Sequence, residues 1–573
     1  MCLNKRNRLN IVNREVNQLA AQQLVEAGIN PLMAQLYAAR GIESAIQLES
    51  SLSGLIPPDK LTHNTQMAKL LADAIAANKT LLVVGDYDAD GATATALAIR
   101  GLRSMGAQVG FLVPNRFEYG YGLTPEIVQL ALNQSPDNSP DILITVDNGI
   151  ASVEGVAAAN ARGLEVLVTD HHLPGDIAPD AICMINPNQH GCDFPSKNLA
   201  GVGVMFYCLL ALRAELRTRG LFLNKQEPNL TELLDLVALG TVADLVKLDN
   251  NNRILVEQGL RRIRAGKAGF GIIALLKLAG RDYQKTSAQD LGFYVGPRLN
   301  AAGRLDDMSL GIACLLADTE ESAQKLAQQL HDLNHARRDI EADMTDTAQI
   351  ALDDLQVDAQ YSISLFQPEC HQGVIGILAS RIKERYHRPV IAFANATDDA
   401  ILKGSGRSIS GLHLRDALDL LSKRMPDLII KFGGHAMAAG LTIKANDFLR
   451  FQQGFEAVCQ FLLTPADLQA VMLVDGGLSA SEMTLQTAIA LDAQVWGQGF
   501  ASPSFCDEFE VINQRVVGEK HLKLKLKKGV ALVDAIYFGH TEFLSEIVQL
   551  VYELKINQYN GVQSVQLLIR HVS

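Results

Sequence analysis

The chain has 573 residues, of which 48% are hydrophobic and 20% are charged, a composition typical of globular proteins in water. A single hydrophobic core is excluded at this length, and roughly three or four domains are expected. The longest apolar stretch, at residues 201–212, is too short to cross a bilayer, so no membrane partner is expected. The net charge of −12 argues against an extended basic surface for a polyanion, although a local basic groove stays compatible with it.

The cysteines and the N-terminus indicate a cytoplasmic protein. The 8 cysteines are scattered and form no C-x-x-C pair, which argues against a zinc ribbon or a disulfide framework and fits a reducing compartment. The N-terminal segment MCLNKRNRLNIVNREVN is basic and polar, and no apolar segment follows it. We therefore expect no secretory signal.

Short apolar runs between Thr80 and Ile185 predict the strands of a parallel sheet. Helical patterns separate most of them, for example Ala92–Met105 and Ser152–Arg162. Strands buried on both faces that alternate with helices are typical of a doubly wound α/β domain, whose ligands bind at the carboxyl ends of the strands. The runs are TLLVVG from Thr80, VGFLV from Val109, ILITV from Ile142, EVLVT from Glu165 and AICMI from Ala181.

A long helix is predicted further along the chain, after a stretch of mostly helical pattern. Residues 312–367 contain neither glycine nor proline, and Thr319–Leu355 has helical spacing with Asp318 or Thr319 as its N-cap. A continuous helix there would be on the order of 50 Å long and would separate two domains. The alternative is a pair of helices with a polar break near Asn334–Arg338.

Two more regions follow this helix. Strand-like runs from Tyr361 and Val390 flank the helical pattern VIGILASRIKERYH, which stops at Pro389 and indicates a second α/β domain. The last part, Pro465–Ser573, is expected to form short strands in a small barrel or sandwich. Its strand-like segments are FEVINQRVVG, HLKLKLKKG, VALVDAIYF and VQSVQLLIR.

The clearest chemical signal is GDYDADGAT, directly after the strand predicted from Thr80. Asp86, Asp88 and Asp90 alternate at the carboxyl end of a buried strand, where such close carboxylates repel one another unless protons or cations offset their charge. Carboxylate oxygens are suitable ligands for Mg²⁺ or Mn²⁺. A solvated acidic turn or a helix N-terminal cluster would give the same letters, so this motif alone leaves both interpretations open.

The pattern recurs at neighbouring strand ends. The strand from Ile142 ends in DNG at residues 147–149, the strand from Glu165 ends in DHH at residues 170–172, and Asp244 follows a helical segment. Imidazole beside carboxylates favours Mn²⁺, Zn²⁺ or Fe²⁺ over Mg²⁺ alone. Anionic ligands around more than one cation are typical of phosphoryl hydrolysis. No G-x-G-x-x-G is formed, so a dinucleotide-binding fold is not supported.

The motifs DYDADG, TVDNG, VTDHH and GTVAD, in this order and spacing, resemble those of the DHH phosphoesterase superfamily. The resemblance implies two Mn²⁺ or Mg²⁺ ions, with Asp147 as a bridging and catalytic ligand. It also implies that His172 contacts the scissile phosphate and that Asn148 is a substrate-binding residue. The implied metal ligands are Asp86, Asp88, Asp90, Asp147, His171 and Asp244.

Glycine-rich segments in the second half resemble the DHH-associated substrate-binding domain. They are HQGVIGILASRIKER from His371, GSGRS from Gly404 and GGHAMAAGL from Gly433. Interpreted as turns, they would expose backbone N–H groups to an anion, and an arginine could bind a phosphate through two hydrogen bonds. Each alone could equally be a tight turn without a ligand. The implied substrate-binding residues are His371, Ser405, Arg407, Gly434 and His435.

Two further segments resemble RecJ-type single-strand-specific DNA exonucleases. VGPRLNAAGRLDD is interpreted as a loop and a helix start, and VPNRFEYGYGL offers a basic and aromatic set suited to phosphate contact and base stacking. The implied substrate-binding residues are Arg298, Asn300 and Arg304 in the first segment, and Arg116, Tyr119 and Tyr121 in the second.

The C-terminal part resembles the oligonucleotide-binding barrel of the same family through VWGQGF and HLKLKLKKG. In a strand, Lys523, Lys525 and Lys527 would lie on one face because side chains alternate with a period of two. We expect Lys523 and Lys525 to bind substrate. The alternative is that these lysines protect an exposed edge strand.

The family resemblance implies a metal-dependent exonuclease that removes nucleotides from the 5′ end of single-stranded DNA in DNA repair and recombination. It also implies a cytoplasmic monomer, with single-stranded-DNA-binding protein and helicases as partners. The expected division of the chain is a helical N-terminal extension at 1–64, a catalytic DHH domain at 65–318, a connecting helix at 319–355, a DHH-associated domain at 356–464 and an OB-fold domain at 465–573.

Other functions stay open at this point. A short-oligonucleotide or cyclic-dinucleotide phosphodiesterase of the same superfamily would usually lack the segment Pro465–Ser573. A manganese pyrophosphatase would not need GSGRS followed by a barrel. A DNA-binding replication scaffold with a decayed site would have lost ligands, whereas every expected acid and histidine is present.

Overall fold

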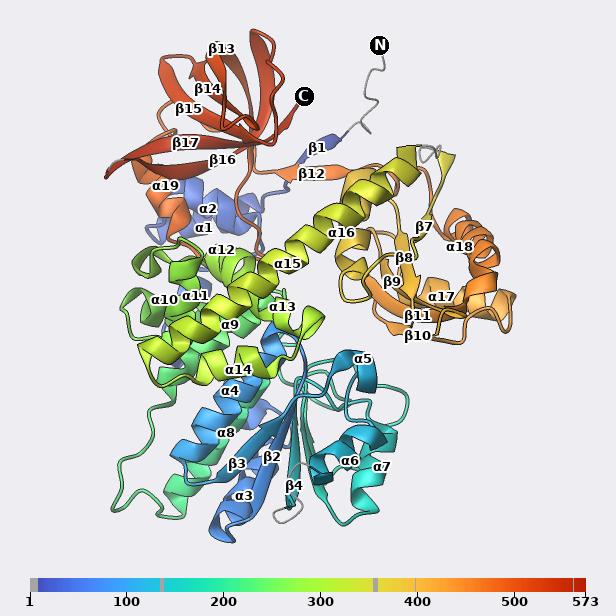
Figure 1. Cartoon of the computed structure of the whole chain (residues 1–573). Helices are drawn as coiled ribbons and strands as arrows, with labels where there is room; N and C mark the ends of the chain where they lie inside the picture. The colour runs from blue at the N-terminus through green and yellow to red at the C-terminus, as the bar shows by residue number, and fades with distance from the viewer. Residues whose placement is uncertain (1–8, 134–138, 354–358, 397, 560) are drawn as a thin grey trace. The chain divides into compact units, whose positions relative to one another are not determined.

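The computed structural model describes residues 9–133, 139–353, 359–396, 398–559 and 561–573. The chain forms two compact units, which are described separately. The larger unit consists of Asn13–Leu333 and Val474–Ser573, and the smaller one consists mainly of Asn334–Leu473. Figure 1 shows the helices and strands along the chain. No described helix is both long enough and apolar enough to cross a membrane.

A parallel 5-stranded sheet with the order β3-β2-β4-β5-β6 forms the centre of the larger unit. Its strand order changes direction between β2 and β4, which is where doubly wound sheets bind ligands. The predicted strands are confirmed, although the last is shorter than the run from Ala181. The strands are β2 (Thr80–Gly85), β3 (Gln108–Leu112), β4 (Ile142–Val146), β5 (Glu165–Thr169) and β6 (Cys183–Ile185).

Helices cover both faces of this sheet. One face packs on α3, α4 and α8, and the other packs on α6 and α7, as Figure 1 shows. Helix α4 is buried around most of its circumference, and its small residues allow this close packing: a Cβ at Gly101 would overlap Leu209 of α8. The helices are α3 (Asn64–Ala76), α4 (Ala89–Ser104), α5 (Arg116–Tyr119), α6 (Pro125–Asn133), α7 (Val153–Asn160) and α8 (Gly201–Thr218).

A helical region follows the sheet in the larger unit. The segment VGPRLNAAGRLDD, expected as a loop and a helix start, forms a π-helix at Leu291–Val295 that continues into α13. Residues 296–305 are therefore helical throughout. The helices of this region are α9 (Leu234–Ala243), α10 (Asn250–Arg264), α11 (Phe270–Leu278), α12 (Ala288–Asp290), α13 (Gly296–Leu305) and α14 (Ser309–Leu316).

Helix α15 (Glu320–Asp353) is continuous, and its length of 34 residues corresponds to the predicted value on the order of 50 Å. The hydroxyl of Thr319 accepts the N–H of Ser322 at 3.2 Å and begins the helix. Arg337 and Glu341, one turn apart, form an ion pair of 2.8 Å within the segment where a break was considered. The two-helix alternative is therefore wrong. Residues 354–358, at the predicted end, lie outside the described residues.

The smaller unit contains a 5-stranded sheet with the order β10-β11-β9-β8-β7. Only the β7–β8 pair is parallel among the described pairings, and the others are antiparallel. Its strands are β7 (Ile363–Phe366), β8 (Val390–Asn395), β9 (Ile401–Arg407), β10 (Lys431–Gly434) and β11 (Ala438–Lys444), and its helices are α16 (Ile375–Tyr386), α17 (Leu414–Arg424) and α18 (Phe448–Leu462).

The interpretation of GSGRS as a turn is wrong, because Gly404–Arg407 form the end of strand β9. The strand pairs with β8 on one side and β11 on the other. A Cβ at Gly404 would lie within 2.7 Å of the side chains of Phe393 and Leu441. The glycine therefore makes room for large neighbours inside the sheet instead of turning the chain.

The C-terminal segment forms a closed barrel with the order β13-β14-β15-β17-β16. The predicted barrel is confirmed, but β16 was missing from the expected strands. Strand β14 pairs with both β13 and β15, so it is not an edge strand and the edge-protection alternative for its lysines is wrong. The strands are β13 (Phe505–Val517), β14 (His521–Lys528), β15 (Ala531–Phe538), β16 (Ile547–Tyr559) and β17 (Val562–Val572).

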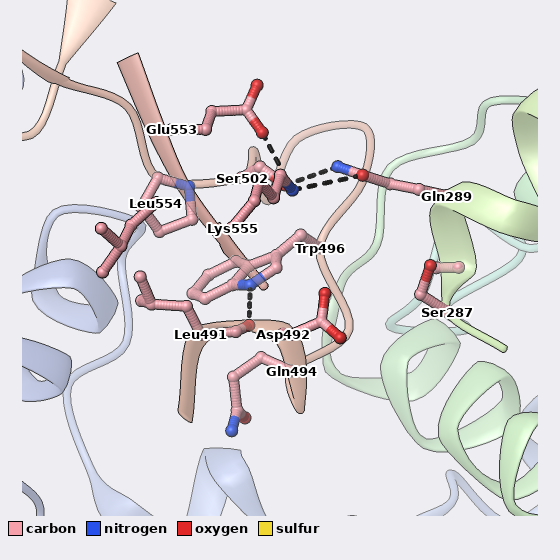
Figure 2. Close-up of a pocket in the computed structure, with 12 residues that line it drawn as sticks. Ser287, Gln289, Leu491, Asp492, Gln494, Trp496, Ser502, Glu553, Leu554 and Lys555 are labelled. Carbon is pink, nitrogen blue, oxygen red and sulfur yellow. Dashed lines mark hydrogen bonds and ion pairs between the residues drawn. The ribbon is translucent and has the colours of Figure 1, made fainter. Parts of the chain in front are cut away.

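The barrel is joined to the helical region within the larger unit by polar contacts around a small cavity (Figure 2). Gln289 of α12 donates to the hydroxyl of Ser502 at 2.8 Å and accepts from Lys555 of β16 at 3.4 Å. The indole N–H of Trp496 donates to the carbonyl of Leu491, in α19 (Leu485–Asp492), at 2.7 Å. The segment VWGQGF therefore packs beside the barrel and contributes no barrel strand.

Arg40 connects the N-terminal part of the larger unit to the segment that precedes the barrel. The helices α1 (Gln18–Glu26) and α2 (Pro31–Ala38) belong to the larger unit, whereas most of β1 (Asn10–Asn13) and of its partner strand β12 (Val471–Val474) belongs to the smaller unit. The guanidinium of Arg40 donates two hydrogen bonds of 2.9 Å to the carboxylate of Asp475, and both side chains are only 2% exposed. Arg40 also lies over the ring of Trp496, at 5.1 Å from its centroid. This buried pair therefore joins the two ends of the larger unit.

Replacing Arg40 with Ala is expected to destabilise the protein strongly, because it leaves the Asp475 carboxylate buried without its bidentate partner. Breaking a buried pair by removing one partner costs about 3–5 kcal/mol. Arg219→Ala is the matched control, because Arg219 pairs at the surface with Asp73 and exposed pairs contribute about 0–1 kcal/mol. Thermal unfolding of both variants measures the difference, and equal melting temperatures would contradict the role of Arg40.

Candidate metal centre

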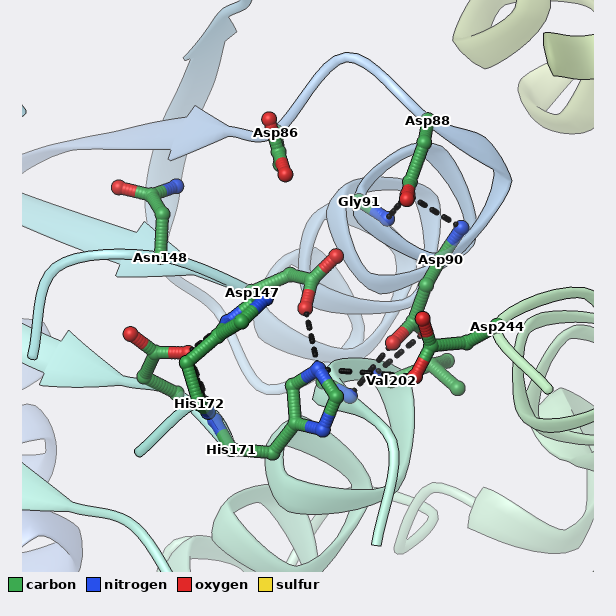
Figure 3. A network of polar contacts seen from close by, with 12 residues as sticks. Asp86, Asp88, Asp90, Gly91, Asp147, Asn148, His171, His172, Val202 and Asp244 are labelled. Atoms are coloured by element: carbon green, nitrogen blue, oxygen red, sulfur yellow. Dashed lines mark hydrogen bonds and ion pairs between the residues drawn. The ribbon is translucent and has the colours of Figure 1, made fainter. Parts of the chain in front are cut away.

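Acidic and histidine side chains from separate elements converge at the carboxyl edge of the parallel sheet (Figure 3). Asp86 follows β2, Asp147 follows β4, His171 follows β5, and Asp244 caps the C-terminal end of α9. The close groups, whose ligand atoms lie within 4.8 Å of one another, are Asp86, Asp88 and Asp147; Asp90, His171 and Asp244; and Asp147, His171 and His172.

Asp88 and Asp90 are oriented by backbone N–H groups. The Oδ1 of Asp88 accepts the N–H groups of Asp90 at 2.9 Å and Gly91 at 3.0 Å, which caps the N-terminus of α4. The carboxylate of Asp90 accepts the N–H groups of Gly201 at 2.6 Å and Val202 at 3.0 Å, at the start of α8. Both aspartates are therefore held in one orientation before any ligand binds.

Two glycines leave space for these carboxylates. A Cβ at Gly201 would lie 2.6 Å from Oδ1 of Asp147, and a Cβ at Gly240 would lie 2.7 Å from Oδ1 of Asp90. Both distances are shorter than the contacts that real Cβ atoms make, so any larger residue would displace a carboxylate. The glycines are required because the acidic groups approach the backbone of α8 and α9 directly.

Asp147 occupies the centre of the cluster. Its backbone is in the left-handed region with φ of 63°, which is uncommon for a residue with a Cβ and typical of strained functional positions. Its buried Oδ1 accepts no hydrogen bond in the described part of the chain, although it lies 3.1 Å from Nε2 of His171. The same Nε2 lies 3.6 Å from Oδ2 of Asp244. Nε2 of His171 and the carboxylate oxygens of Asp147 and Asp244 therefore face a common point, as the ligands of one metal site do.

The electrostatics of the cluster fit divalent cations. Burial and then the charge of Asp88 raise the pKa of Asp90 to about 7. Burial and then the charge of Asp90 raise the pKa values of Asp147 and Asp244 well above the ordinary range. Carboxylates that repel one another this strongly need protons or cations, and oxygen ligands with one imidazole suit Mn²⁺ or Mg²⁺. The residues therefore fit the metal ions that the sequence predicts.

Asp170 fixes the orientation of His172, a role that the sequence analysis did not assign. Its Oδ1 lies 2.8 Å from Nδ1 of His172, and it also accepts the N–H groups of His171 and His172, while its Oδ2 accepts that of Ile150. Burial lowers the pKa of His172, but the hydrogen bond and charge of Asp170 outweigh it and raise the pKa to about 9. His172 is therefore held as a cation at the edge of the cluster. The sequence feature that could have identified Asp170 is its position directly after an apolar strand.

The predicted substrate-binding residues near this edge differ in their surroundings. The hydroxyl of Tyr121 lies 3.1 Å from Nε2 of His172, and its ring contacts Tyr87 edge to face at 6.1 Å. Asn148 is buried and donates to the carbonyls of β2 and β4, at Val84 and Val146. Tyr119 is half-buried at the end of α5, and the side chain of Arg116 lies outside the described residues.

Of the residues predicted on α13, Arg298 is buried, and Asn300 and Arg304 are half-buried. Arg298 is 8% exposed and donates to the carbonyl of Tyr294 at 2.5 Å and to Nδ1 of His331 in α15 at 3.2 Å. The Oδ1 of Asn300 accepts the N–H of Ala89 at 2.7 Å. Arg304 lies in the last turn of α13 and is half-buried.

In the smaller unit, Ser405 and Arg407 lie together beside the start of α16. Nη1 of Arg407 donates to the hydroxyl of Ser405 at 3.3 Å, and a Cβ at Gly376 would lie 2.9 Å from both side chains. His371 precedes α16, and its Nδ1 accepts the N–H of Gly373 at 3.1 Å. Gly434 and His435 lie where β10 ends, before β11 begins.

The lysines of β14 lie on one face of the barrel strand, as predicted, and differ in their partners. Lys525 forms an ion pair with Asp534 at 3.0 Å, and Lys527 forms one with Glu510 at 2.8 Å. Lys523 forms no ion pair among the described residues, and its neighbour on β13 is Arg515. The positive charge of this face is therefore concentrated at Lys523 and Arg515.

Family models match three parts of this chain: the DHH family N-terminal domain at residues 80–241, the DHHA1 domain at 358–460 and the RecJ OB domain at 474–571. The single-stranded-DNA-specific exonuclease RecJ of Salmonella typhimurium is 50% identical, covering 97% of this chain and 98% of its own length. The enzyme of the same name from Escherichia coli is 49% identical, covering 99% of each chain. The chain belongs to the RecJ family.

A solved RecJ-family structure shares the architecture. The crystal structure of RecJ in complex with Mn²⁺ from Thermus thermophilus covers 100% of this chain and 80% of its own, with a TM-score of 0.81 and 29% identity. The predicted fold, a parallel-sheet domain, a second α/β domain and a C-terminal barrel, is confirmed. The match to the RecJ OB domain also favours this family over the shorter phosphodiesterases of the superfamily.

The metal-free protein is expected to lose stability as the pH rises from about 6 to about 8. The folded-state pKa of Asp90, about 7, lies above its ordinary 3.8, so the folded state binds more protons than the unfolded state in this range. His172, raised from 6.5 to about 9, acts in the same direction. Asp90 alone contributes roughly 1 kcal/mol between these two pH values.

Thermal unfolding in a chelator at the two pH values measures this loss. Because Mn²⁺ competes with protons for the same carboxylates, its addition should raise the melting temperature more at the higher pH. Greater stability of the metal-free protein at about pH 8 than at about pH 6 would contradict this account of the carboxylate cluster.

Proposed function

We propose that this protein is a metal-dependent exonuclease that hydrolyses the phosphodiester bonds of single-stranded DNA from the 5′ end, in DNA repair and recombination. The observation that carries the proposal is the convergence of five aspartates and a histidine, the predicted ligand set, on one edge of a RecJ-family sheet. The relatives that match over nearly the whole chain are single-stranded-DNA-specific exonucleases.

The donor set supports two Mn²⁺ or Mg²⁺ ions, and the similar structure from Thermus thermophilus contains Mn²⁺. Asp147 and His171 each belong to two of the close groups, which supports a bridging role for Asp147. When bound, such ions polarise the phosphate and activate the attacking water. The proposed ligands are Asp86, Asp88, Asp90, Asp147, His171 and Asp244.

We assign to His172 the task of contacting the scissile phosphate. Asp170 accepts from its Nδ1 and keeps the ring charged, and we assign its Nε2, which lies 3.1 Å from the hydroxyl of Tyr121, as the charged donor toward a phosphate oxygen. Tyr121, whose hydroxyl lies beside that nitrogen, limits how the ring can turn. This arrangement stabilises negative charge on the phosphate without a proton leaving the protein.

Further residues are proposed to hold the DNA strand. Ser405 and Arg407, beside the start of α16, offer a hydroxyl and a guanidinium for a phosphate. On the barrel, Lys523 is a better candidate than Lys525, whose charge Asp534 neutralises. The remaining proposed contacts are Arg116, Tyr119, Tyr121, Asn148, Arg298, Arg304, His371, Gly434 and His435.

We keep the predicted division of the chain and its setting as proposals. The matched family models at 80–241, 358–460 and 474–571 support the catalytic, DHH-associated and OB-fold parts. All described cysteines are unpaired thiols, and most are buried, which supports a reducing cytoplasm. We also propose a monomer that works with single-stranded-DNA-binding protein and helicases.

Replacing Asp147 with Asn is expected to lower the rate of hydrolysis more than about 100-fold, because changes in the outer shell of a metal site already cost 10- to 100-fold. Binding of a single-stranded oligonucleotide, measured by fluorescence anisotropy, should change little. Asp176→Asn, at an exposed aspartate outside the cluster, is the matched control and should retain wild-type hydrolysis. Hydrolysis by Asp147→Asn at the wild-type rate would rule out the bridging role.

Digestion of end-labelled DNA with Mn²⁺ tests the substrate and the polarity. From a single strand labelled at its 5′ end, we expect the label to appear at once as a short product, whereas a 3′-labelled strand should give a ladder of shortened strands. A blunt duplex of the same sequence should stay intact. Early release of the 3′ label, or equal degradation of the duplex, would contradict the proposed polarity or strand selectivity.

A further inference from the structure

Helix α13 packs directly against the metal loop, defined here as Asp86–Asp90. A Cβ at Gly303 of α13 would overlap the carbonyl oxygen of Tyr87, the central part of this loop. On the other side, a Cβ at Gly91 would overlap the backbone of Asp86. The loop is therefore enclosed between α13 and the first turn of α4, with backbone on both sides.

Hydrogen bonds from the first N–H groups of α4 hold the metal loop in this position. The N–H groups of Asp90 and Gly91 are accepted by the side chain of Asp88, and that of Ala92 by its backbone carbonyl at 2.9 Å. The N–H of Ala89 is accepted by Oδ1 of Asn300 at 2.7 Å, from a residue 211 positions away in the sequence. The donor is a backbone N–H, so the amide oxygen of Asn300 must face it.

The donor end of this bond is buried, and Asn300 itself is half-buried. Ala89 is 1% exposed, and a buried N–H without an acceptor is unfavourable. Arg298, two residues earlier on α13, ties the helix to the carbonyl of Tyr294 and to His331 of α15. Asn300 therefore projects from a helix that is itself anchored.

We propose that Asn300 is a positioning residue for the metal ions, acting through the backbone of the metal loop. Its amide oxygen sets the orientation of the first turn of α4 and thereby the direction in which Asp88 and Asp90 present their carboxylates. Second-layer groups of this kind orient metal ligands in many sites. This role replaces the substrate contact predicted for Asn300, and it rests on the proposed metal-dependent function.

The test compares Mn²⁺ binding in variants of the full chain. Free Mn²⁺ is measured by electron paramagnetic resonance in titrations without DNA, so the readout does not depend on activity. Asn300→Ala removes the acceptor and should weaken Mn²⁺ binding about 10- to 100-fold. Asn300→Asp keeps an acceptor for the N–H of Ala89 and should bind Mn²⁺ within about threefold of the wild type, because a carboxylate at a helix N-terminus is favourable.

Asn64→Ala is the control for loss of stability alone. Asn64 is fully buried, and it donates to the carbonyls of Pro58 and Tyr207, outside the metal loop. It should lower the melting temperature without weakening Mn²⁺ binding. If Asn300→Ala fails to fold, Asn300→Ser, whose shorter hydroxyl loses the 2.7 Å contact, takes its place and should show the same weakening.

The outcomes separate the two proposals. Wild-type Mn²⁺ affinity in Asn300→Ala together with weaker binding of a single-stranded oligonucleotide would overturn the positioning role and restore the substrate contact. Weaker Mn²⁺ binding in Asn300→Asp to the same degree as in Asn300→Ala would also overturn it, because the acceptor is present. Absence of Mn²⁺ binding by the wild type would instead refute the proposed metal-dependent function itself.

Discussion

Mutual repulsion among buried carboxylates is the constraint on which the rest of the larger unit depends. Asp90, Asp147 and Asp244 are carboxyl groups in a place where burial and the neighbouring acids disfavour the charged form, as their raised pKa values show. The fold holds two acids of the cluster, Asp88 and Asp90, with backbone N–H groups from the starts of α4 and α8. Small residues around the cluster, such as Gly201 and Gly240, let the backbone of α8 and α9 approach these carboxylates.

The same constraint explains where histidine is used. Asp170 is as buried as the other acids, yet its pKa is lowered: burial raises it, but the hydrogen bond and charge of His172 outweigh this. Its negative charge is balanced inside the protein, whereas the charge of the neighbouring cluster is left for an external cation. Asp170 and the acids of the cluster thus serve different purposes because Asp170 has a cationic partner of its own in His172.

Sequence reasoning predicted the elements whose signal is local. The strands at Thr80, Ile142 and Glu165 are continuous apolar runs, and the acids that follow them meet because parallel strands end at one edge. It failed where the decisive partner lies far away in the chain. GSGRS has the letters of a turn, but Phe393 and Leu441 fill the space beside its glycine, and the acceptor for Ala89 comes from Asn300.

The division of the larger unit into two stretches of chain has a consequence for its synthesis on the ribosome. The larger unit is interrupted after Leu333 and continues at Val474, so most of the smaller unit is made in between. Arg40 is synthesised 435 positions before Asp475, with which it pairs in the folded protein. Because domains fold as they emerge, the N-terminal helices must stay without their final partner until the barrel segment leaves the exit tunnel. A nascent chain truncated before Val474 is therefore the species most exposed to chaperones and proteases.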